Sequence, residues 1–133
     1  MTLLVSVIVC ACASKKTDAN DEGHPATLDA NVWKEMDEFH IIMAEAFHPY
    51  KDSSNLEPAK KGASGLLRAA NAWAAAPLPD KVNNDQVKSK LQQLKSEATT
   101  LAESVQSADD NVIAEQLTKL HDTFHAIQEE WYH

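Results

Sequence analysis

The chain has 133 residues, with 20 acidic and 12 basic side chains that give a net charge of −8 at pH 7. This length provides one domain with a modest core and leaves no room for a second. Because the balance is acidic and Arg68 is the only arginine, the chain lacks the basic surface that a phosphate backbone requires, and we expect no nucleic-acid partner.

The N-terminus carries an uncharged apolar run over residues 3–13. Its length is typical of a signal-peptide core and falls short of the about 20 apolar residues that span a bilayer. Small Ala11 precedes Cys12, whereas a bulky valine precedes Cys10, so Cys12 is the better candidate for lipid attachment. We predict a lipoprotein-type signal peptide over residues 1–11 and a periplasmic protein held at the membrane by a lipid on Cys12.

A polar tract follows this leader. Residues 12–25 contain almost nothing apolar to bury and include a glycine and a proline, so they are predicted to form a flexible tether. Both cysteines of the chain belong to the N-terminal segment, which leaves the remaining domain without a disulfide. Its stability must come from side-chain packing.

Residues 26–133 show the period of amphipathic helices four times, and no segment alternates with period two. Four such helices predict an all-α fold, with Trp33, Trp73 and Trp131 packed in or beside the core. The apolar positions of the four segments are, in chain order, Leu28, Val32, Met36, Phe39, Met43 and Phe47; Ala63, Leu66, Leu67, Ala70, Trp73 and Ala74; Val87, Leu91, Leu94, Ala98, Leu101 and Val105; and Ile113, Leu117, Leu120, Phe124, Ile127 and Trp131.

Proline, asparagine and aspartate indicate where these helices begin and end. Pro49 is expected to end the first helix, which makes the connection to the second helix the longest. Asn83 or Asn84 is expected to cap the third helix, and Asp109 or Asp110 the fourth. Because short connections force neighbouring helices to run in opposite directions, the sequence predicts an antiparallel up-and-down four-helix bundle.

Histidines supply the candidate chemistry. His121 and His125 are four residues apart, so they lie one turn apart on one face of the last helix, a spacing that lets two imidazoles approach one metal ion. Met36 and His40 lie at a similar offset on the first helix. If these two helices are antiparallel neighbours, Met36 is expected level with His125 and His40 level with His121. His48 is expected to lie outside this group.

The predicted metal ligands are therefore Met36, His40, His121 and His125. Imidazole and thioether ligands suit haem iron, copper or zinc, whereas calcium and magnesium prefer oxygen.

Residues 115–125, Glu-Gln-Leu-Thr-Lys-Leu-His-Asp-Thr-Phe-His, resemble the last helix of the cytochrome b-562 family, and the Leu-Arg-Ala-Ala stretch over residues 67–70 adds to the similarity. Members of this family are periplasmic four-helix bundles related in fold to cytochrome c prime. The resemblance implies an electron carrier that binds haem b noncovalently, with His125 and Met36 as axial ligands. A Cys-x-x-Cys-His motif is replaced here by His121-Asp122-Thr123-Phe124-His125, so covalent haem attachment is excluded.

Two other functions stay open. The additional imidazoles of His40 and His121 favour a small ion, so the chain is alternatively a haem-free lipoprotein that binds copper or zinc and exchanges it with a partner in the cell envelope. The other alternative is a purely structural envelope protein. Enzyme activity is not expected, because the sequence has no glycine-rich phosphate loop, no nucleophile elbow and no cysteine beyond residue 12.

Overall fold

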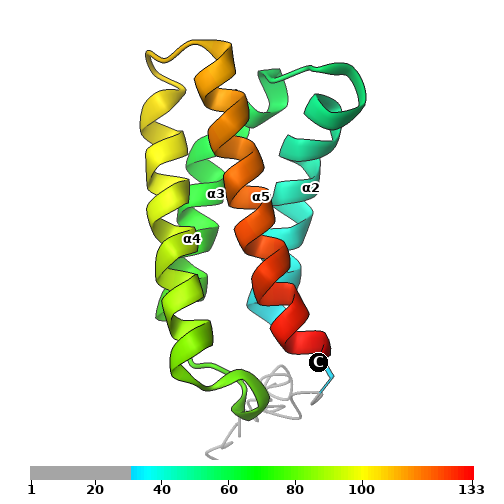
Figure 1. Cartoon of the computed structure of the whole chain (residues 1–133), viewed down its shortest axis with the longest axis vertical. Helices are drawn as coiled ribbons and strands as arrows, with labels where there is room; N and C mark the ends of the chain where they lie inside the picture. The colour runs from blue at the N-terminus through cyan, green and yellow to red at the C-terminus, as the bar shows by residue number, and fades with distance from the viewer. Residues whose placement is uncertain (1–30) are drawn as a thin grey trace, which may run out of the picture. The chain divides into compact units, whose positions relative to one another are not determined.

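The computed structural model describes residues 31–133, and over this range the chain forms a four-helix bundle without strands (Figure 1). The helices are α2 (Lys34–Ser53), α3 (Glu57–Ala75), α4 (Asp85–Ser104) and α5 (Asp110–Tyr132), and a short 3-10 helix, η1 (Asp80–Val82), lies between α3 and α4. The all-α four-helix fold predicted from the sequence is confirmed. The predicted signal peptide, the tether and Cys12 lie outside the described residues.

Successive helices run in opposite directions, as the colour gradient of Figure 1 shows: α2 and α4 rise in that view, and α3 and α5 descend. Contacts between α4 and α5 agree with this arrangement. Lys90 of α4 bonds to Glu130 at 2.6 Å, and Gln93, one turn later, bonds to Thr123 at 3.2 Å. Residue numbers thus rise along α4 as they fall along α5. Helix α2 also packs against α5, which closes the bundle.

The core consists of one continuous set of buried side chains from all four helices and η1. Its largest members are aromatic: Trp33 packs edge-on against Trp73 at 5.2 Å between ring centroids, and Phe39 lies 5.7 Å from Phe124. Trp131 is 3% exposed and contacts Trp33 at 5.6 Å. The three tryptophans are therefore core residues, as the sequence predicted.

Side-chain caps start α4 and α5 at the expected places. The Asn84 side chain accepts a hydrogen bond from the Val87 N–H at 2.9 Å, and the Asp109 side chain accepts one from the Val112 N–H at 3.1 Å. Each satisfies a backbone donor that the first turn of a helix leaves unpaired. The N-cap residue of α3, Leu56, has no side-chain acceptor, but the preceding Asn55 side chain accepts a hydrogen bond from the Glu57 N–H at 3.1 Å.

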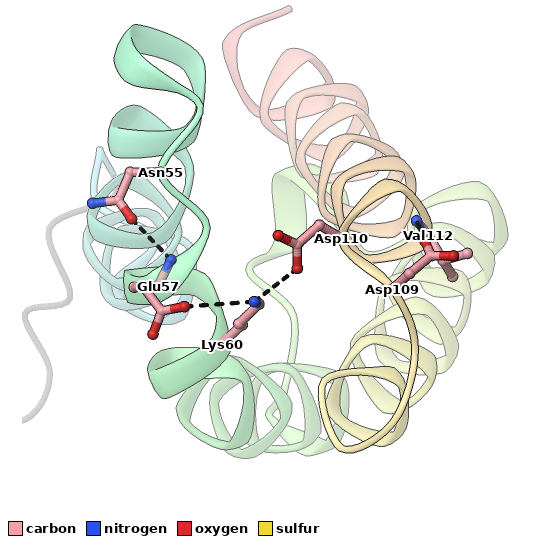
Figure 2. Close-up of polar contacts among 6 residues, drawn as sticks. All are labelled: Asn55, Glu57, Lys60, Asp109, Asp110 and Val112. Atoms are coloured by element: carbon pink, nitrogen blue, oxygen red, sulfur yellow. Dashed lines mark hydrogen bonds and ion pairs between the residues drawn. The ribbon is translucent and has the colours of Figure 1, made fainter.

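Figure 2 shows how polar contacts join the start of α3 to the start of α5. Lys60 lies between two carboxylates, 2.7 Å from Asp110 and 3.5 Å from Glu57. The side chain thus bridges two helices that are not consecutive in the chain.

Helix α2 begins and ends later than the sequence suggested. Trp33 has an extended backbone (φ −112°, ψ 92°), so α2 starts only at Lys34. The prediction that Pro49 ends the first helix is wrong, because α2 continues through Pro49 to Ser53 and ends where Ser54 adopts a left-handed conformation (φ 56°). A proline in the last turn removes one N–H but still offers its carbonyl, which accepts a bond from the Asn55 N–H at 3.1 Å. The connection to α3 is consequently short.

Candidate metal site

The site lies where α2 packs against α5, and contacts along the two helices fix their register. Phe39 lies beside Phe124, and Phe47 lies beside His121. Residue numbers therefore rise along α2 as they fall along α5, so the two helices are antiparallel. The expectation that the first and last helices are neighbours is confirmed.

The register differs by about one turn from the one expected. The ring of His40 stacks on Phe124 at 5.2 Å, which places His40 level with Phe124, about one turn along α5 from His121. The expected levels were counted from Leu28, but α2 starts at Lys34. Met36 is accordingly in the first turn of its helix, and the predicted pairing of levels is wrong.

Structure and sequence agree on the proximity of His121 and His125. Their Nε2 atoms are 3.1 Å apart and their ring centroids 4.4 Å apart. Phe47 covers one face of the His121 ring in a near-parallel stack, with centroids 3.7 Å apart and an interplanar angle of 11°. The two nitrogens are thus held on one side of α5, and Phe47 fixes the orientation of one ring.

Hydrogen bonds indicate the tautomers of the pair. Nδ1 of His121 lies 3.3 Å from the Asp122 carboxylate, so it carries the proton and donates it. Nε2 of His121 then has a free lone pair, which accepts the Nε2–H of His125. A carboxylate behind one imidazole nitrogen orients the opposite nitrogen and makes it more basic, an arrangement common at protein metal sites.

Burial of the ring lowers the pKa of His121 below its ordinary value of 6.5. The hydrogen bond to Asp122 acts in the opposite direction, and the charges of His125 and His48 lower the pKa further. His121 is therefore mainly neutral at pH 7, which is the state in which an imidazole binds a metal ion.

His48 belongs to the surroundings of this pair, although the sequence prediction set it apart. It directly follows Phe47, which stacks on the His121 ring, and it is one of the smaller causes that lower the pKa of His121. The sequence signal for His48 was weak, because its closeness to α5 depends on the register between the helices.

The other predicted ligands, Met36 and His40, make no contact with the pair that would add a ligand to it. His40 is exposed and sits against the Phe124 ring, whereas Met36 is 1% exposed and packed within the core. Within residues 31–133, no three side chains of histidine, cysteine, aspartate or glutamate lie together as a metal-binding group. The structure thus provides two convergent nitrogens, from His121 and His125.

Two clefts of the described region lie away from these histidines. One of about 190 Å³ runs between α4 and α5 and is lined by residues that include Glu97, Val112 and Gln116. The other, of about 440 Å³, lies beside the α3–α4 connection near Leu78 and Leu91. Neither adjoins the histidine pair.

Comparison with known proteins found no matching family model, no matching curated protein and no matching solved structure. The similarity to the cytochrome b-562 family therefore stays a prediction from residues 115–125 and 67–70. Among the helices of residues 31–133, none is both long and apolar enough to cross a membrane.

Proposed function

We propose that this protein binds one copper or zinc ion through the Nε2 atoms of His121 and His125. The observation that carries this function is the 3.1 Å separation of the two nitrogens. Two nitrogens about 2.0–2.1 Å from one ion lie roughly 2.9 Å apart at a right angle and roughly 3.3 Å apart at the tetrahedral angle. The pair falls between these values, so the separation of the two nitrogens suits two ligands of one ion once the rings turn their lone pairs towards it.

Proton positions are compatible with such binding. His121 already has its proton on Nδ1, next to Asp122. The proton on Nε2 of His125 must leave, and a shift to Nδ1 of the same ring keeps that imidazole neutral. Metal binding then replaces a hydrogen bond between the two rings with two metal–nitrogen bonds.

Two protein ligands leave the rest of the coordination sphere open. Copper and zinc accept imidazole readily, whereas calcium and magnesium require oxygen ligands that the pair does not offer. An ion with open positions exchanges its remaining ligands easily, which suits a protein that holds an ion and passes it to a partner. We therefore assign a non-catalytic role in metal carriage.

The packing favours a small ion over haem b. A porphyrin between Met36 and His125 has to enter the core beside Met36, where Phe39, Trp73 and Phe124 are each completely buried. These rings lie 5.5–6.2 Å from one another, so a flat group larger than any side chain must displace them. Haem ligation by His125 and Met36 is the second candidate, supported by the resemblance of residues 115–125.

In this function the protein acts in the cell envelope, held at the membrane by a lipid on Cys12. The support comes from the sequence, where small Ala11 and an apolar run precede the cysteine. A labelled fatty acid supplied to the producing cells should enter the protein, and Cys12→Ser should abolish the label while Cys10→Ser leaves it. Labelling that survives Cys12→Ser contradicts this attachment residue.

Equilibrium dialysis against Cu²⁺ and Zn²⁺, with metal analysis of the retained protein, tests the metal site. The full chain should carry Cys10→Ser and Cys12→Ser in this experiment, because thiolates bind both ions. His125→Ala should weaken binding at least about tenfold, since losing even an outer partner of a ligand costs that much. His133→Ala removes an exposed imidazole at the end of α5 and is the matched control.

Haem titration of the same sample separates the two candidates. A sharp Soret band that depends on both His125 and Met36, together with no retained copper or zinc, overturns the small-ion site and supports haem. Retained metal that is insensitive to His121→Ala and His125→Ala also contradicts the proposed function.

A further inference from the structure

The histidine pair supplies only two of the four ligands of a four-coordinate ion. His125 is exposed, and no third histidine, cysteine, aspartate or glutamate among residues 31–133 joins the pair as a metal-binding group. The open half of the coordination sphere therefore faces away from the bundle. Ligands that fill it therefore come from outside residues 31–133, and a second copy of the chain can supply them.

The same face of the bundle exposes apolar side chains. Ile41 and Tyr132 are 62% and 66% exposed, the highest values among the large apolar residues of the described region. Ile41 precedes His48 by seven residues, and Tyr132 follows His125 by seven. Seven residues at about 100° each bring a helix back to within roughly 20° of the same direction. Ile41 and Tyr132 thus lie on the histidine-bearing stripes of α2 and α5.

From this arrangement we propose that one metal ion joins two copies of this chain, each of which contributes His121 and His125. This inference rests on the proposed function. A second copy related by a two-fold axis brings two more imidazole nitrogens, which complete four-coordination. It also brings a second Ile41 and Tyr132 to the same contact, so apolar surface is buried as the coordination sphere fills.

Charge makes this association depend on the ion. Each chain has a net charge of −8, so two copies repel one another when no metal is bound. A divalent ion at the contact offsets part of this repulsion and supplies the directional bonds. We expect a monomer without metal and a dimer with it.

Sedimentation velocity with Zn²⁺ tests this, using the full chain with Cys10→Ser and Cys12→Ser. Zn²⁺ is the suitable probe because it is redox-inert and prefers four ligands. Half an equivalent of Zn²⁺ per chain should double the 14.6 kDa mass, and a chelator should reverse the change. His125→Ala should keep the monomer mass at the same zinc concentration.

Variants of the exposed apolar residues distinguish the effect of the contact between the two copies from the effect of the zinc ligands. Ile41→Lys should retain zinc binding and shift the protein towards monomer. Val112→Lys changes an exposed apolar residue beside the α4–α5 cleft and should leave the dimer intact. Circular dichroism of each variant identifies any that fails to fold, and Tyr132→Lys then serves in place of Ile41→Lys.

The zinc stoichiometry and the mass together distinguish the shared site from the proposed function. One zinc ion per monomer, without a change in mass, refutes the shared site while the proposed function stands. Absence of zinc binding refutes the shared zinc site, and absence of copper binding in the dialysis experiment as well refutes the proposed function. A dimer that persists in the chelator or in His125→Ala shows association independent of the ion and also overturns this inference.

Discussion

Replacement of Phe47 by leucine tests the contact that organises the proposed site. Phe47 is 7% exposed and stacks on the His121 ring at 3.7 Å, so it shields one face of that imidazole from water. Leucine preserves most of the buried apolar volume but cannot form the stack. We therefore expect two effects, a loss of stability and a rise in the pKa of His121.

The expected loss of stability follows from two contributions. A swap that nearly conserves side-chain volume costs less than about 1.5 kcal/mol, and a lost aromatic pair costs about 0.5–1.5 kcal/mol more. Together they give about 0.5–3 kcal/mol. Each kcal/mol lowers the Tm of a domain of this size by about 4–8 °C.

The pKa should rise towards 6.5, because burial is the largest cause of its depression. In the folded protein His121 holds its proton less tightly than in the unfolded chain, so the unfolded state gains protons first as the pH falls. His121 thus contributes stability that is complete above pH 6.5 and is lost as the pH falls through its lower folded-state pKa. Phe47→Leu should reduce this dependence on pH.

Titration of the His121 ring by NMR, together with thermal melts above and below pH 6.5, measures both effects. Phe39→Leu is the matched control, because Phe39 is completely buried and packs on Trp73 and Phe124. That variant should lose stability without moving the pKa of His121. An unchanged pKa in Phe47→Leu refutes the register that we assign to α2 and α5.

Three further substitutions test the helices that support the site. Gly62→Ala should stabilise the protein by up to about 1 kcal/mol in chemical denaturation, because the added Cβ meets nothing within 4 Å and alanine favours the helix; destabilisation argues against this environment. Asp109→Ala should lower the free energy of unfolding by about 1 kcal/mol, since it removes the cap on the Val112 N–H; an unchanged Tm contradicts that role. Lys90→Met should cost about 1 kcal/mol or less and should remove salt dependence that arises from the pairing with Glu130; an equal salt response in both proteins counts against the bridge.

The sequence predicts the helices and their caps well because these depend on local chemistry. Apolar periodicity places the buried faces, and the caps at Asn84 and Asp109 form where a short polar side chain precedes each helix. Pro49 shows the limit of such local rules. It is compatible with the last turn of α2, so the end of that helix is decided instead by the left-handed Ser54.

The site is only partly predictable because periodicity fixes the face of a helix but not its axial position against a neighbour. Spacing alone places His121 and His125 on one face, and the structure brings their Nε2 atoms to 3.1 Å. The proximity of His48 and the stack with Phe47 depend on the register between α2 and α5. That register is defined by ring contacts between the two helices, such as Phe39 with Phe124 and Phe47 with His121, which the apolar pattern of either helix does not reveal.

The most direct test of the proposed site is a long-range ¹H–¹⁵N spectrum of the histidine rings, recorded on the full chain with both cysteines replaced by serine. Addition of Zn²⁺ should shift Nε2 of His121 and of His125 together, while Nδ1 of His121 stays protonated and Nδ1 of His125 gains the proton that leaves Nε2. The ring nitrogens of His133 should not move. If Zn²⁺ leaves both Nε2 signals unchanged, or shifts only the nitrogens of other histidines, the metal site assigned here is wrong.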